Sequence, residues 1–140
     1  MKVSKISPII IFGFIAIIYA FPILNNISYW GQMDWDQFTF CNAVPRETIL
    51  KYHQFPLWNP YSNGGNVMLA LPHSSFLSPF FILVLLFGPV VGLKIQLVIS
   101  LFLGVLGMFF LARYFKMKKI SQYLPPGIFM LSSLFTLHLT

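Results

Sequence analysis

Two long apolar runs without a charged residue constrain the fold of this chain more than any other feature. Residues 6–24 give nineteen uncharged positions, and residues 95–112 give eighteen. Because an α-helix rises 1.5 Å per residue, these runs correspond to helices of about 27–28 Å, close to the hydrocarbon thickness of a bilayer. The sequence therefore predicts two complete transmembrane helices.

The composition supports a membrane protein. Of the 140 residues, 57% are hydrophobic and 9% are charged, whereas roughly 25% of the residues in a soluble domain are charged. The single cysteine, Cys41, excludes an internal disulfide and a cysteine metal cluster. The net charge of +6 does not indicate nucleic acid, because six of the nine cations flank apolar runs: Lys2, Lys5, Arg113, Lys116, Lys118 and Lys119.

These basic clusters predict the topology. Lys2 and Lys5 place the N-terminus in the cytoplasm, so residues 25–75 form an extracytoplasmic loop and residues 113–123 a cytoplasmic basic loop. Lys94 precedes the second span and is expected to extend to the outer headgroups. A cleaved signal peptide is the alternative for residues 6–24, but no small-x-small cleavage site follows them.

A further apolar segment, residues 76–89, is too short to span. It is interrupted by Pro79, Gly88 and Pro89, which leaves nine residues, or about 13 Å of helix. A third full span here would also place the second basic cluster outside. We therefore expect an interfacial or re-entrant helix on the outer side, covered by protein.

The last run, residues 124–140, opens with two prolines and stops without a flanking anchor. It is expected to be the start of a third transmembrane helix. The chain then is either the N-terminal fragment of a longer polytopic protein or ends with this helix at the outer surface.

Residues 53–79 are rich in Pro, Gly, Asn and aromatic side chains. Four prolines and the Gly64-Gly65 pair disfavour a regular helix or strand through this stretch, because proline lacks a backbone N–H and glycine readily adopts positive φ. An ordered loop is therefore expected. Before it, Pro45 is predicted to be the first residue of a short helix that ends near His53. Val44, which precedes proline, should be extended.

Four segments then occur in a recognisable order: DWDQF from Asp34, QFPLWNPYSNGG from Gln54, LALPHSSFLSPFFILVLLFG from Leu69 and GLKIQLVISLFLGVLGMFFLARYF from Gly92. Together they resemble the N-terminal part of the YfhO-type bacterial membrane proteins, which are related to the GT-C glycosyltransferases. The resemblance implies an all-α polytopic protein of the bacterial cytoplasmic membrane. It also implies a much longer chain with a long outer loop that carries short surface or re-entrant helices.

The resemblance further implies a chemistry. In GT-C enzymes an acidic residue of the outer loop acts as a base or helps to hold a divalent cation, and the sugar donor is an isoprenoid-phosphate lipid. The matching positions are Asp34 and Asp36, which are the catalytic and metal-binding candidates. Two residues depart from the family pattern: Pro45 interrupts a longer helix, and His73 stands where glutamine is typical.

The residues themselves leave alternatives open. Asp34 and Asp36 could orient a cation or accept a proton, but Asp before a helical run also commonly caps it. Arg46 and Lys51 could contact a phosphate, or they could form an ion pair within a helix or be solvated.

Flat aromatic rings beside amides suit a sugar, which makes Trp58, Asn59 and Tyr61 substrate-binding candidates; the same residues are also typical of interface anchors and tight turns. His53 and His73 lack a third ligand at metal spacing, so a zinc site is not predicted.

Two functions are consistent with the sequence. The first is transfer of a lipid-phosphate-linked sugar on the outer face of the membrane. The second is a non-catalytic scaffold, transport or envelope-assembly factor of the same architecture. In either case residues 1–140 alone are expected to be inactive, because two and a half spans cannot enclose a substrate site. The sequence indicates neither donor, acceptor nor oligomeric state.

Overall fold

The computed structural model describes residues 7–29 and 34–132. The basic residues Lys2 and Lys5 and the end of the predicted third span, residues 133–140, lie outside them. The described chain is mostly helical and has few strands. Its elements are α1 (Ser7–Tyr19), α2 (Phe21–Asn25), α3 (Trp35–Tyr52), β1 (Trp58–Asn59), β2 (Asn66–Val67), the 3₁₀ helix η1 (Met68–Ala70), α4 (Phe81–Phe87), α5 (Pro89–Tyr114), the 3₁₀ helix η2 (Ser121–Tyr123) and α6 (Leu124–Met130).

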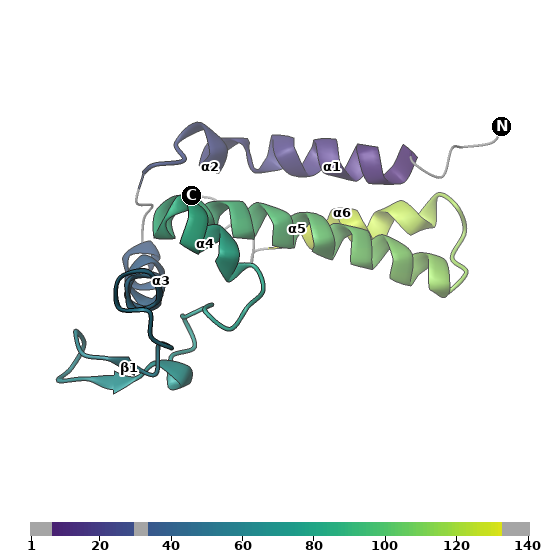
Figure 1. Cartoon of the computed structure of the whole chain (residues 1–140). Helices are drawn as coiled ribbons and strands as arrows, with labels where there is room; N and C mark the ends of the chain where they lie inside the picture. The colour runs from purple at the N-terminus through teal and green to yellow at the C-terminus, as the bar shows by residue number, and fades with distance from the viewer. Residues whose placement is uncertain (1–6, 30–33, 133–140) are drawn as a thin grey trace. The chain divides into compact units, whose positions relative to one another are not determined.

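The chain divides into two compact units (Figure 1). The first comprises the described parts of residues 1–25 and 97–140, and the second the described parts of residues 26–96. Helix α5 contributes its first residues to the second unit and the remainder to the first.

Helix α5 confirms the predicted run at residues 95–112 and extends it at both ends. It has 26 residues, and it is the one helix in the described part of the chain that is long and apolar enough to cross a membrane. It begins at Pro89, where the missing N–H costs nothing. The preceding Gly88 has φ 88°, a conformation that glycine adopts without strain and that separates α5 from α4.

The first apolar run is not one continuous helix. Helix α1 ends at Tyr19, and α2 follows after Ala20. Pro22 has no N–H with which to bond the carbonyl of Ile18, so the helical ladder is interrupted there. The bond from Leu24 N to Ala20 O, 3.0 Å long, restores it. A second full span in this region is not shown by the structure.

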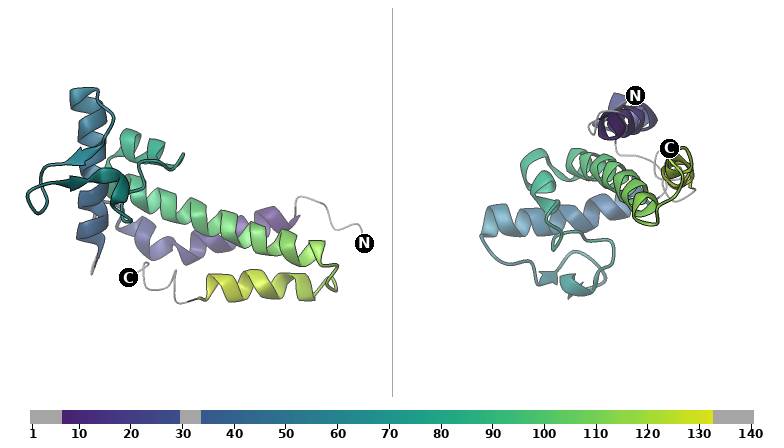
Figure 2. Two further views of the ribbon diagram at one scale, coloured as in Figure 1. Left: turned by 90° about the horizontal axis from the view of Figure 1, so that it is seen from below. Right: turned by 90° about the vertical axis from the view of Figure 1, so that its right-hand side faces the viewer.

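Helices α1, α5 and α6 lie side by side in the first unit (Figure 2). Their shared core consists of Phe12, Ala16, Leu101, Val105, Phe109 and Met130. Gly104 lies against the Phe129 ring of α6 at a distance that leaves no room for a Cβ.

Helix α3 differs from its prediction. It starts at Trp35 and continues through Pro45, so Val44 is helical and not extended. A proline inside a helix costs about 3 kcal/mol through the lost hydrogen bond and the ring clash. Cys41, Val44 and Pro45 are all buried, and this burial favours the continuous helix over the local preference.

The stretch at residues 53–79 was predicted to be an ordered loop without regular helix or strand. It is ordered, but it contains regular structure. Strands β1 and β2 pair antiparallel, with Trp58 opposite Val67 and Asn59 opposite Asn66. The turn between them is made possible by positive φ at Asn63 (51°), Gly64 (76°) and Gly65 (108°). Sequence reasoning recognised the glycines as turn residues but missed the hairpin. Helix α4, with seven residues, is too short to span a bilayer, as predicted.

Candidate functional site

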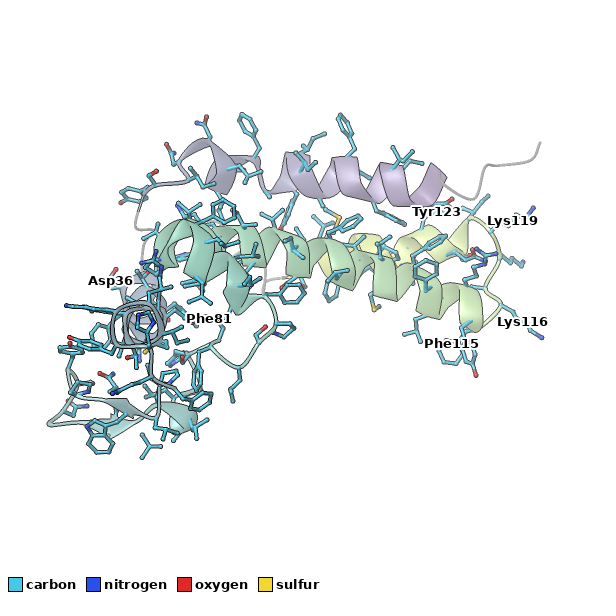
Figure 3. The ribbon with its side chains drawn as sticks, in the orientation of Figure 1. Asp36, Phe81, Phe115, Lys116, Lys119 and Tyr123 are labelled. Carbon is cyan, nitrogen blue, oxygen red and sulfur yellow. The ribbon has the colours of Figure 1, made fainter. Side chains whose placement is uncertain are left out.

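The two predicted catalytic carboxylates lie at the start of α3. Asp34 occupies the N-cap position and makes no side-chain capping bond, while its carbonyl accepts a bond from Phe38 N at 3.1 Å. Asp36 lies in the first helical turn (Figure 3). Both side chains are exposed, and both are favoured near the positive end of the helix dipole. The structure thus brings two solvent-facing carboxylates to one helix end.

A protein-only metal site is not formed there. Within residues 7–29 and 34–132, no group of three or more His, Cys, Asp or Glu side chains lies together. A divalent cation at Asp34 and Asp36 would therefore need water or the oxygens of a bound phosphate to complete its coordination.

Arg46 contacts backbone instead of standing free in the loop. Its Nε donates to Val84 O at 2.9 Å and to Leu85 O at 3.3 Å. Both carbonyls belong to the last turn of α4, where a positive charge is favourable, and Val84 O also accepts from Gly88 N at 3.0 Å. The side chain of Arg46 thus caps α4 from α3.

Lys51 forms the i, i+4 pair that was the alternative to an anion contact. Its Nζ lies 3.0 Å from Glu47 Oε1. The hydrogen bond that Lys51 donates to the Glu47 carboxylate raises the pKa of Lys51. Arg46 and Lys51 do meet at one open depression of about 420 Å³, which is lined by Ala43, Arg46, Glu47, Leu50, Lys51 and Pro89. Asp34 and Asp36 do not line it.

The three predicted sugar-binding residues lie in different environments. Trp58 and Tyr61 are exposed, whereas Asn59 is fully buried. The Asn59 Oδ1 accepts a bond from Tyr61 N at 2.9 Å, which closes an Asx turn, and its Nδ2 has no partner among the described residues. Asn59 therefore shapes the turn and does not face solvent.

Asn42 is the central polar residue of the second unit, and sequence reasoning did not identify it. It is fully buried in the middle of α3. Its Nδ2 donates to Phe38 O (2.8 Å) and His73 O (3.0 Å), and its Oδ1 accepts from Ser75 N and Ser75 Oγ, both at 2.8 Å. The amide thereby fixes the chain after the hairpin to α3.

Lys94 was expected to extend to the outer headgroups, and that expectation is wrong. Its side chain is buried, and Nζ donates to Asn26 O at 2.7 Å and to Tyr29 O at 2.6 Å. The Trp35 ring lies 6.0 Å from the ammonium, within cation–π range. An ammonium has three donors, and the carbonyls of the turn after α2 lack helical partners, so both needs are met.

Across residues 7–29 and 34–132 the chain is mostly helical, and one helix there is long and apolar enough to cross a membrane. Comparisons with models of protein families, with curated proteins and with solved structures give no match.

Proposed function

We propose that this chain is the N-terminal part of a GT-C-like membrane glycosyltransferase that uses a lipid-phosphate-linked sugar donor. It is multi-pass, with its N-terminus in the cytoplasm and residues 25–75 at the outer face of the bacterial cytoplasmic membrane. The observation that carries the proposal is the pair of exposed carboxylates, Asp34 and Asp36, at the N-terminus of α3. The order of segments that resembles the YfhO-type proteins supports it.

The chemistry assigned to the pair is proton transfer. One carboxylate accepts the proton of the acceptor hydroxyl while that oxygen attacks the anomeric carbon of the sugar and the lipid phosphate leaves. Asp36 is the preferred base because it opens the DQF segment most similar to the family. Asp34 would orient the acceptor or share a divalent cation with the donor phosphate.

The test is sugar transfer by the full-length protein carrying Asp34→Asn or Asp36→Asn. A general base contributes about 10²–10⁴-fold to rate, so at least one variant should lose about 100-fold or more. Glu47→Gln is the matched control because Glu47, the remaining acidic residue, is paired with Lys51 and lies away from the helix start. Full activity in both Asp variants would sink the catalytic assignment.

A non-catalytic scaffold, transport or assembly role is the second candidate. The observation that favours it is that two residues predicted to contact the substrate make contacts within the fold instead. Arg46 caps α4, and Asn59 is buried in its turn. Under this function the Asp34 and Asp36 variants keep the cellular phenotype, and variants that loosen the second unit lose it.

The proposed topology has its own test. Met117→Cys in a Cys41→Ala background should be inert to a membrane-impermeant maleimide in intact cells and should react once the cells are permeabilised, because residues 113–123 are assigned to the cytoplasm. Lys51→Cys, at an exposed position of the assigned outer loop, should react in intact cells. External labelling at position 117 would overturn the two-span topology.

A further inference from the structure

The β1–β2 hairpin has inverted polarity. Directly opposite residues of an antiparallel pair share one face, and neighbouring residues alternate between faces. Trp58 and Val67 therefore share a face, and they are 53% and 48% exposed. The opposite face carries Asn59, which is 0% exposed, and Asn66, whose Oδ1 is buried. In a hairpin with one face exposed to water, the polar side chains face outward and the apolar side chains are covered.

More apolar side chains extend this exposed surface on either side of the strand pair. We define the apolar face of the hairpin as Trp58 and Val67 together with the exposed residues Phe55, Tyr61 and Leu69, which lie outside the strand pair. The Trp58 ring also lies against Gly65, where a Cβ would collide with it. The indole is thus held by backbone contact while half of its surface faces outward.

The segment that carries this face is also free of charge. Residues 54–72 contain no Asp, Glu, Lys, Arg or His. Protein interfaces surround an apolar centre with a polar rim and are enriched in Arg. A stable dimer contact uses about 20–30 residues a side, several times more than this face offers. A neutral mixture of Trp, Tyr, Leu and Phe is instead the composition that partitions into the membrane interface.

We propose that the apolar face of the hairpin inserts into the headgroup and upper acyl region of a bilayer. The occupant is lipid, and because residues 54–72 are uncharged, insertion does not depend on anionic headgroups. The buried asparagines then keep the turn closed while the outward residues are covered by lipid. This role holds whether or not the protein transfers a sugar.

The experiment uses the whole chain in proteoliposomes. In a Cys41→Ala background, Val67→Cys carries an environment-sensitive fluorophore, and lipids with a nitroxide near the headgroup act as quenchers. Lys51→Cys on α3, which is exposed and lies outside the apolar face, is the matched control. We expect at least about threefold greater quenching at position 67 than at position 51, equal in zwitterionic and anionic vesicles.

A second labelled position, Leu69→Cys, tests the same face just after β2 and should behave as position 67 does. Circular dichroism of each labelled variant verifies that the helical content is retained. Equal quenching at positions 51 and 67 overturns the proposal. So does blue-shifted emission without lipid quenching at positions 67 and 69, since protein and not lipid would then cover the face.

Discussion

Replacing Asn42 by alanine is expected to detach residues 73–75 from α3 and to cause the largest loss of stability in the second unit. The substitution removes four hydrogen bonds and leaves the His73 carbonyl and the Ser75 N–H without this partner, while Ser75 Oγ keeps its contact with Gln96 Oε1 at 3.4 Å. Unpaired buried polar groups cost about 1–3 kcal/mol each. We expect a loss of about 4 kcal/mol in the local stability of this region.

The neighbouring Cys41 provides the measurement. It is the single cysteine of the chain and is buried, and its burial raises the pKa of the thiol. Thiol alkylation therefore requires local opening of α3. A loss of about 4 kcal/mol corresponds to labelling that is about 10³-fold faster.

Two variants accompany this measurement. Asn25→Ala, at the exposed end of α2, should label at the unmodified rate. Asn42→Asp keeps the acceptor for Ser75 but places a buried carboxylate against the Phe38 and His73 carbonyls, so its labelling should be at least as fast as that of the alanine variant. A slow, unchanged rate for Asn42→Ala would show that the Asn42 hydrogen bonds do not hold the loop.

The second large effect is expected for Gly92→Ala. A Cβ at position 92 would lie 2.5 Å from Val84 Cα and 2.7 Å from Leu83 O, so it would meet the backbone of α4. Alanine favours a helix over glycine by about 1 kcal/mol, but overpacking against backbone costs about 3 kcal/mol. The net loss of about 2 kcal/mol should move α4 away from α5 and disturb the Arg46 contacts, with about thirtyfold faster alkylation of Cys41.

Helix α5 contains its own control for this experiment. A Cβ at Gly107 would meet no atom within 4 Å. Gly107→Ala should therefore leave the labelling rate unchanged or lower it, since only the helix propensity changes. Equal rates for the two alanine variants would mean that the close contact at Gly92 is not required.

Short-range patterns predicted much of the fold. The uncharged run at residues 95–112 predicted α5. The helix-breaking residues Pro79, Gly88 and Pro89 predicted that α4 would be short. The prediction failed where a local rule competed with burial. Pro45 and Val44 suggested a helix start, but the buried side of α3 made one helix from Trp35 to Tyr52 more favourable. The first apolar run contains Pro22. Because proline has no backbone N–H to donate, it interrupts the helix and makes it shorter than the predicted span.

The candidate site could be predicted only in part, because local sequence patterns do not show contacts between distant residues. The exposure of Asp34 and Asp36 follows from a polar helix start. The partners of Arg46 and Lys94 are backbone carbonyls 38 to 68 positions away, and no local pattern encodes such contacts. Asn59 looked like a sugar ligand by type, but the pairing of Asn59 with Asn66 places it on the covered face of the hairpin.

The capping of α4 by Arg46 has a consequence for the order in which the chain assembles. A ribosome adds about 5–20 residues per second, so Arg46 is made about 2–8 s before the carbonyl of Val84, 38 positions later, that it binds. The cap for α4 therefore already exists when that apolar segment leaves the ribosome. The short apolar segment can therefore dock against Arg46 during synthesis, and α4 is capped as soon as its last turn forms.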